Sequence, residues 1–209
     1  MRKLVSLFAG LAAVLTLAAC QKSGIDTRYD MTLGDPKARV TVVEYSSVAC
    51  PHCARFNNEV FPAFRAKYVD TGKVHYVSRE FLVGNQEEVS IAVAGFLTAR
   101  CAGKDKYFQV TDAIFHALEQ IESPGSQPHA ILQQIALSAG LTREQFEACI
   151  RDEKAQKALF DRVQAYGKAD KVESTPTFIV NGKSYSGEKS LADFDAIIAE
   201  AERRGKAAS

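Results

Sequence analysis

The sequence has 209 residues, of which 46% are hydrophobic and 24% are charged, and its formal net charge is +1. This apolar content is ordinary for a folded protein, and the length gives room for one domain or for one domain with a sizeable insertion. Arg2 and Lys3 lie in the first three positions, so the rest of the chain is close to neutral. Such a chain, without long runs of like charge, does not attract a polyanion, and we expect no nucleic-acid role.

The N-terminus has the pattern of an export signal. A basic start precedes residues 4–19, a mostly apolar run that is short for a membrane span and typical of a secretory signal. The run ends in Leu17-Ala18-Ala19-Cys20, which resembles the bacterial lipobox, in which the cysteine is lipid-modified and becomes the new N-terminus. Ordinary cleavage after Ala19 is the alternative, but Leu17 is large for that site. We therefore predict a lipoprotein signal peptide over 1–19, a lipid anchor on Cys20 and a short tether over 20–35.

The first strong structural signal is a strand followed by a cysteine pair. Val40 to Tyr45 is an apolar run typical of a buried strand, and Cys50-Pro51-His52-Cys53 follows it, before a long amphipathic pattern. Strand, turn, C-x-x-C and helix are the sequence context of a thioredoxin-like redox pair. Half of a structural zinc site is the alternative interpretation. A tetrahedral site needs a second ligand pair, however, and the sequence has no second C-x-x-C.

The two cysteines are expected to differ in chemistry. If Cys50 is the N-cap of the helix, Pro51 occupies the first helical position, where its missing N–H costs nothing. Cys50 then meets the unpaired N–H groups and the positive end of the helix dipole, and His52 can add a hydrogen bond or a positive charge. Such surroundings lower the pKa of a thiol and stabilise the reduced protein, so the disulfide becomes the better oxidant. The motif therefore predicts a donor of disulfides.

The remaining elements follow in the order of an interrupted α/β fold. A second core strand is expected over residues 74–81, after a helix that Pro62 should kink. The pattern is wholly helical over 86–167, residues 177–185 read as a hairpin with an Asn-Gly turn, and a last helix starts near Ser190. We predict a thioredoxin fold with an inserted α-helical domain: the thioredoxin-like part over 36–85 and 168–209, and the insertion over 86–167.

Several of these features together resemble the DsbA-like thiol:disulfide oxidoreductases of the thioredoxin superfamily. They are Glu44, the Cys-Pro-His-Cys motif, the helical insertion and Ser174-Thr175-Pro176-Thr177-Phe178, and the likeness covers residues 36–200. The resemblance implies that Cys50 forms the mixed disulfide with a client protein, that Cys53 resolves it and that His52 tunes Cys50. Glu44 matches the family's buried acid, a proton acceptor for Cys53 whose burial raises its pKa toward neutrality. A strand-end ion pair is the other interpretation of Glu44.

Two further features gain meaning from the resemblance. Thr175-Pro176 matches the family's cis-proline loop, which packs opposite the C-x-x-C and offers backbone groups to an extended client segment. Its threonine departs from the valine of the best-known oxidases and occurs in isomerase and reductase relatives. Cys101 and Cys149 each lie on the apolar face of a predicted helix of the insertion. In an oxidising compartment they could form a structural disulfide, as in some family members, or remain two buried thiols.

The leader and the resemblance together predict a periplasmic enzyme anchored to a membrane by lipid. It would donate the Cys50–Cys53 disulfide to reduced secreted proteins and be reoxidised by a quinone-linked membrane protein, as a monomer without cofactor or metal. Thr175 suggests a disulfide isomerase or reductase as the second hypothesis. The third is a non-enzymatic lipoprotein whose C-x-x-C holds Cu(I), a metal that soft thiolates accept.

Overall fold

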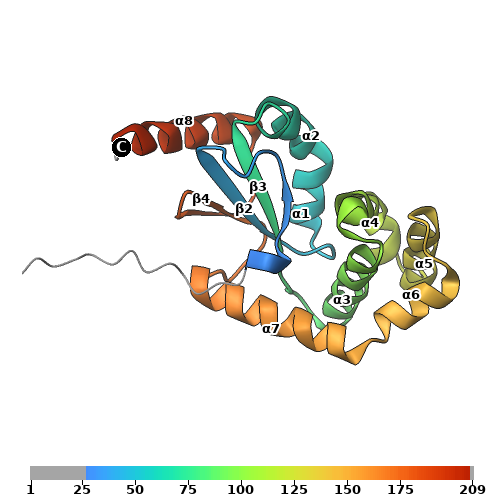
Figure 1. Ribbon diagram of the computed structural model, residues 1–209. Helices are drawn as coiled ribbons and strands as arrows, with labels where there is room; N and C mark the ends of the chain where they lie inside the picture. Colours follow the sequence, from blue (N-terminus) through green and yellow to red (C-terminus); the bar gives the residue numbers. More distant parts are fainter. Residues whose placement is uncertain (1–26, 208–209) are drawn as a thin grey trace, which may run out of the picture.

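The computed structural model describes residues 27–207, and a five-stranded mixed sheet lies at its centre (Figure 1). β2 and β3 run parallel, and the other neighbouring strands are antiparallel. In spatial order the strands are β1 (Met31–Leu33), β3 (Val74–Glu80), β2 (Val40–Ser46), β4 (Thr177–Val180) and β5 (Lys183–Ser186). The predicted signal peptide and Cys20 lie outside the described residues.

The central strand β2 is covered on both faces because its side chains alternate between them. Val40 and Val42 pack in one apolar cluster with Phe64 of α2 (Phe61–Phe64) and Phe194 of α8 (Leu191–Ala207). Tyr45 points to the opposite face, where it packs against residues of α7 (Glu153–Asp170). Burial on both faces explains the nearly continuous apolar run from which the sequence predicts this strand.

The helix after the cysteine pair is not regular along its length. It starts as α1 (Pro51–Arg55) and passes through a π-helical turn (Phe56–Val60), in which the Phe61 N–H donates to the Phe56 carbonyl five residues earlier. α2 follows with Pro62 in its first turn, and a second π-helical turn covers Arg65–Val69. Pro62 has no N–H to donate to a continuous α-helix, so the interruption falls where the sequence predicts it.

The helical insertion forms its own apolar core beside the sheet (Figure 1). Its helices are α3 (Gln86–Cys101), α4 (Tyr107–Glu122), α5 (Pro128–Ser138) and α6 (Arg143–Ile150), after which α7 returns to the sheet. The core includes Val48 from the turn before the cysteine pair. Gly95 of α3 permits this approach, since a Cβ there would lie 2.9 Å from Val48 Cγ2. The predicted thioredoxin fold with a helical insertion is thus confirmed.

The predicted tether needs a correction at its end. Residues 27–29 form a 3₁₀ turn, and β1 adds residues 31–33 to the sheet by antiparallel pairing of Met31 with Ser78. These residues therefore belong to the fold. A strand of three residues is too short to show an alternating pattern, and its hydrogen-bond partners lie far along the chain.

A buried ionic network ties the sheet to the insertion. The Glu80 carboxylate at the end of β3 is only 4% exposed and accepts from the guanidinium groups of Arg100 on α3 and Arg162 on α7. Next to it on β3, Arg79 bridges Asp30 and Asp170. Removal of one partner from a buried ion pair destabilises the protein, because the other charge is left buried and unpaired. This network therefore fixes how the insertion meets the sheet.

Among the described residues, none of the helices combines the length and the apolar character of a membrane span.

Candidate active site

Cys50 and Cys53 lie at the start of α1, directly after β2. The chain turns through residues 47–49, and the Cys50 N–H donates to the Ser47 carbonyl at 3.1 Å. Cys50 takes the N-cap position with an extended backbone, and Pro51 is the first helical residue. Both cysteines are free thiols; Cys53 is completely buried and Cys50 is 6% exposed. Of the two residues, only Cys50 has surface that a second molecule can reach.

The pKa values of the two thiols are displaced in opposite directions. The pKa of Cys50 is lowered to about 5, mainly by a hydrogen bond from Cys53 and also by Thr175 and the backbone N–H groups of Cys53 and His52, while burial opposes the shift. The pKa of Cys53 lies well above its ordinary value, because of burial, its hydrogen bond to Cys50 and the negative charges of Cys50 and Glu44. At neutral pH the reduced pair therefore holds one proton, on Cys53, and one negative charge, on Cys50.

Glu44 lies on β2 behind the cysteine pair and is 4% exposed. Burial raises its pKa to about 7, against the lowering effects of the Tyr76 hydrogen bond and of Ser46. The Tyr76 hydroxyl on the neighbouring strand β3 donates to Glu44 Oε2. The carboxylate thus pairs with a tyrosine hydroxyl and not with a cation, so the alternative of a strand-end ion pair is wrong. A carboxyl group with this pKa exists in both protonation states near neutral pH, which suits proton transfer.

The Thr175-Pro176 peptide bond is cis and lies opposite the cysteine pair. Cys50 Sγ is 3.7 Å from the Thr175 carbonyl oxygen. The loop is held from behind, since the Gly187 N–H donates to the Pro176 carbonyl at 2.8 Å. This arrangement leaves the Thr175 backbone beside the reactive sulfur.

The His52 side chain is engaged outside the cysteine pair. Its Nδ1 pairs with the carboxylate of Glu188, which also lies 3.2 Å from an Arg55 guanidinium nitrogen. His52 acts on Cys50 through its backbone N–H. The sequence suggested a hydrogen bond or charge from the imidazole, and gave no sign of Glu188 because that residue lies 136 positions away.

Cys101 and Cys149 are joined by a disulfide between α3 and α6. The alternative of two reduced thiols is therefore not the state of this structure. The bond lies within the insertion and connects two helices that are 48 positions apart in sequence.

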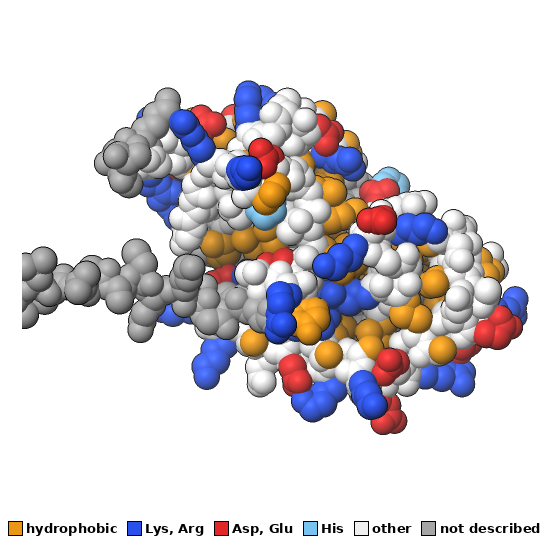
Figure 2. All heavy atoms as spheres, viewed as in Figure 1, with side chains coloured by type: hydrophobic (Ala, Val, Ile, Leu, Met, Phe, Trp, Pro, Cys, Tyr) orange, Lys and Arg blue, Asp and Glu red, His pale blue; other side chains and the backbone are white. Residues whose placement is uncertain are grey.

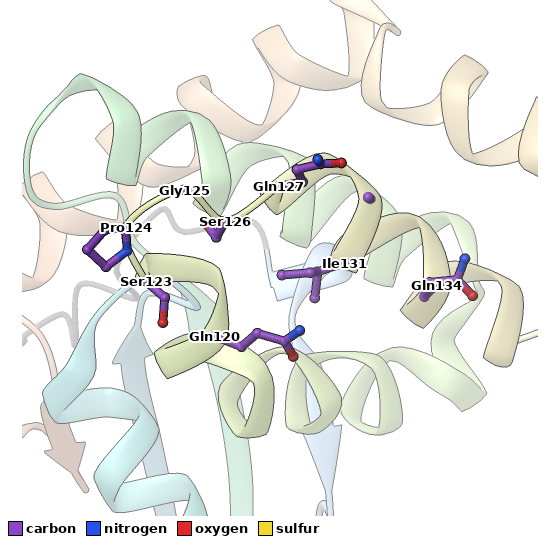
Figure 3. A pocket seen from close by; sticks show the side chains of 9 residues that line it. Gln120, Ser123, Pro124, Gly125, Ser126, Gln127, Ile131 and Gln134 are labelled. Atoms are coloured by element: carbon purple, nitrogen blue, oxygen red, sulfur yellow. The ribbon is translucent and has the colours of Figure 1, made fainter.

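Two surface hollows lie near the insertion. A groove of about 700 Å³ runs between β1, α2 and α4, on the face where Figure 2 shows hydrophobic side chains between the sheet and the insertion. A pocket of about 390 Å³ lies between the end of α4 and α5, surrounded by Gln120, Gln127 and Gln134 (Figure 3). The lining of this second pocket contains no cysteine and no ionisable side chain, so it offers no acid–base or redox chemistry.

A strand–C-x-x-C–helix unit with a low-pKa thiol at the helix start, a buried acid and a cis-proline loop defines a thioredoxin-fold thiol–disulfide exchange protein. The family profile described as Thioredoxin matches residues 26–200. A Rickettsia bellii protein named as a protein-disulfide oxidoreductase is 33% identical over 178 residues, which are 84% of this chain and 67% of that protein. A Rickettsia typhi protein of the same designation is 34% identical over 153 residues, 73% of this chain and 55% of its own length.

Solved structures give the same assignment. Alpha-DsbA1 from Wolbachia pipientis has a TM-score of 0.77 and 26% identity, over 88% of this chain and 96% of that one. BdbD from Bacillus subtilis shares the fold, with a TM-score of 0.70 and 22% identity over 87% of this chain and 96% of that one. The chain belongs to the thioredoxin family and is a DsbA-like thiol:disulfide oxidoreductase.

Sequence reasoning missed three residues around the site. Tyr76 is the hydrogen-bond donor to Glu44, and Ser46 lies two residues after Glu44 on the same face of β2. The third residue, Glu188, pairs with His52. Tyr76 comes beside Glu44 only through the pairing register of β2 and β3. Local sequence patterns do not predict that register before the fold is known.

Proposed function

We propose that this chain is an exported oxidase that donates the Cys50–Cys53 disulfide to reduced client proteins. The observation that supports it is the opposite displacement of the two thiol pKa values, to about 5 for Cys50 and well above the ordinary value for Cys53. A thiolate that is stable at neutral pH is a good leaving group, and its stability favours the reduced protein. The oxidised protein therefore passes its disulfide on readily.

The proposed transfer has two exchange steps. A client thiolate attacks Cys50 Sγ, a mixed disulfide forms, and the Cys50–Cys53 bond breaks. Cys53 leaves with the electron pair and takes a proton from the Glu44 carboxylic acid. A second client thiolate then attacks the client sulfur of the mixed disulfide, and Cys50 leaves as a thiolate. The client gains a disulfide, and the enzyme gains two electrons.

The cis-proline loop is the proposed site for the client backbone. Thr175 lies beside the Cys50 sulfur, and the Gly187 N–H holds the Pro176 carbonyl, so the loop is a fixed surface next to the point of attack. An extended client segment bound there places its cysteine close to Cys50. This positioning would turn a bimolecular reaction into an effectively unimolecular one.

The proposed location is the periplasm, with a lipid on Cys20 as the anchor to the membrane. The lipobox-like end of the leader supports this placement. The proposed reoxidant is a quinone-linked membrane protein, since each client turnover leaves the enzyme reduced. Metabolic labelling with a fatty acid tests the anchor: wild-type protein should be labelled and Cys20→Ala should not. Equal labelling of the two proteins would exclude lipidation at this residue.

Equilibration with glutathione tests the oxidase function. We expect a reduction potential more oxidising than the roughly −270 mV of thioredoxin, because the Cys50 thiolate is stabilised. Cys50→Ser, which cannot form the bond, is the control for the readout. A potential in the reducing range of thioredoxin would remove the basis for disulfide donation.

Thr175 favours a disulfide isomerase as the second candidate function. Refolding of a protein with scrambled disulfides separates the two, together with a measurement of molecular mass in solution. An oxidase of the proposed kind is a monomer that oxidises reduced client and rearranges scrambled client slowly. Rapid rearrangement by a dimer would reverse this ranking.

A further inference from the structure

A groove runs along the seam between α4 and α5 of the insertion. It consists of the pocket of about 390 Å³ described above and a second hollow of about 180 Å³, and the two adjoin at Gln134, which lines both. The pocket lies beside Gln120 near the end of α4, and the hollow lies beside Gln109 near its start. In a helix these eleven positions correspond to about 16 Å, the length of about five residues of extended chain. We call this feature the α4–α5 groove.

One side of each helix lines the α4–α5 groove, and this side is uncharged. The lining positions are 109, 113 and 120 on α4, and 127, 130, 134 and 138 on α5. Their spacings of three, four and seven place each set along one side of its helix. Neither hollow is lined by an ionisable side chain, although 24% of the chain is charged. A charged group entering the groove would lose water without meeting a counter-charge, so the lining favours an uncharged occupant.

Three glutamine side chains at the pocket are available to such an occupant. Within residues 27–207, the side-chain amides of Gln120, Gln127 and Gln134 make no hydrogen bond to the protein. Figure 3 shows them around the apolar side chain of Ile131. Each amide carries two N–H donors and an acceptor oxygen, which match the C=O and N–H groups of a peptide backbone. Free amides beside an apolar surface therefore suit an extended peptide with neutral side chains.

The loop between α4 and α5 is held in place by its own hydrogen bonds. Ser123 Oγ donates to the Glu119 carbonyl at 2.7 Å, and Ser126 Oγ donates to the Ile121 carbonyl. The Ser126 N–H also donates to the Ser123 carbonyl at 3.0 Å. Gly125 between them has a φ of +79°, a value that side-chain-bearing residues rarely adopt. The pocket is thus formed before a ligand binds, which lowers the entropic cost of binding.

The pocket end of the α4–α5 groove lies on the side of the reactive cysteine. Cys50 belongs to the same apolar cluster as Ile121 in the last turn of α4. Burial and the negative charges of Glu88 and Cys50 raise the pKa of Glu122, so this end of α4 lies within electrostatic range of the thiolate. Ser123, the next residue, already lines the pocket. A client segment that leaves Cys50 across the end of α4 therefore meets the groove.

We propose that the α4–α5 groove binds an uncharged, extended segment of the client a short distance along the chain from the cysteine that attacks Cys50. The inference rests on the proposed disulfide donation and adds a class of client, namely unfolded proteins with a run of neutral residues near the reactive cysteine. The cis-proline loop takes the residues next to that cysteine, and the groove takes residues farther along. Binding in the groove raises the local concentration of the client thiol at Cys50. The bonds formed and broken in the exchange stay the same.

Reduction of the oxidised protein by cysteine peptides tests the groove. The reference is cysteine blocked at both ends, and two peptides add a tail of about ten neutral residues, before the cysteine in one and after it in the other. Alkylation at set times and mass spectrometry give the rate at which the Cys50–Cys53 bond is lost. We expect one of the two tails to raise this rate about fivefold over the reference. The same tail with glutamate at alternate positions should give no gain. A wild-type protein that gains from neither neutral tail, or equally from the charged one, would overturn the proposal.

A pair of matched variants locates the effect in the groove. Gln134→Glu places a negative charge where the two hollows adjoin, and the ratio of the rates with and without the neutral tail should fall about fivefold. Gln164→Glu is the same substitution at an exposed position of α7, outside both linings, and should keep the wild-type ratio. Because both positions are exposed, neither change disturbs the core. Equal ratios in the two variants would contradict binding in the groove.

The same measurements separate this inference from the proposed function. If the oxidised protein reacts with the blocked cysteine and a neutral tail brings no gain, binding in the groove fails and disulfide donation stands. If the oxidised protein reacts with none of the peptides and not with reduced glutathione, disulfide donation itself fails.

Discussion

The Glu188 carboxylate pairs with Nδ1 of His52, so the imidazole inside the Cys-Pro-His-Cys motif is held by a residue from the loop after β5. The neighbouring residue of that loop, Gly187, donates its N–H to the carbonyl of cis-Pro176. One short loop therefore connects the two halves of the site, the cysteine helix and the cis-proline loop. It also places a negatively charged carboxylate on the imidazole of His52.

Glu188→Gln should lower the pKa of Cys50. The substitution removes that negative charge and leaves the imidazole of His52 free to approach the thiolate. Exposed charge pairs contribute about 0.2–1 kcal/mol, which corresponds to a shift of about half a pKa unit. Ultraviolet thiolate absorbance measures this shift, with Glu59→Gln in the π-helical turn after α1 as control. In the double variant Glu188→Gln/His52→Ala, the part of the pKa decrease that comes from the imidazole should be absent. A raised pKa in Glu188→Gln would contradict this interpretation.

The reduced protein should be more stable than the oxidised protein, and the difference should depend on pH. The pKa of Cys50 is lowered from 9.0 to about 5. The Cys50 thiolate therefore stabilises the reduced protein. This stabilisation is fully present when the pH is above the ordinary thiol pKa, and it is lost as the pH falls through about 5. Urea unfolding of both redox forms at about pH 4 and about pH 7 measures the difference, which should be larger at the higher pH. If the stability difference between the redox forms is the same at both pH values, the Cys50 thiolate is not its cause.

Glu44→Gln should stabilise the protein at alkaline pH. The pKa of Glu44 is raised from 4.5 to about 7, so its stability contribution is present below about 4.5 and is lost as the pH rises through about 7. A neutral amide does not titrate, and relative to wild type the variant should gain about 3 kcal/mol at about pH 8 compared with about pH 4. Denaturant unfolding at the two pH values gives the number. Glu87→Gln, at an exposed position, should show no such gain. If Glu44→Gln also shows no gain, burial does not raise the pKa of Glu44.

Removal of the second disulfide should cost stability without altering the reactive thiol. The Cys101–Cys149 bond closes a separation of 48 residues, for which the chain-entropy model gives about 4 kcal/mol. Cys101→Ala/Cys149→Ala should therefore unfold at a lower denaturant concentration, while the thiolate titration of Cys50 stays at the wild-type value. An unchanged midpoint would mean that the cross-link does not constrain the unfolded chain.

The local parts of the fold could be predicted because each is written in consecutive residues. The apolar run of β2, the C-x-x-C at a helix N-terminus and the Asn181-Gly182 turn all appear where the patterns indicate. β1 was missed because a three-residue edge strand takes its stability from pairing with distant β3.

The sequence by itself determined the chemical class: two cysteines at helix spacing, a proline between them and an acid six residues earlier predict thiol–disulfide exchange. Only the tertiary structure decided how the site is surrounded. It joined Tyr76 to Glu44, Glu188 to His52 and Thr175 to Cys50. The reason is physical. Reactivity at the helix start arises from neighbours along the chain, whereas burial and hydrogen-bond partners come from strands and loops that meet only after folding.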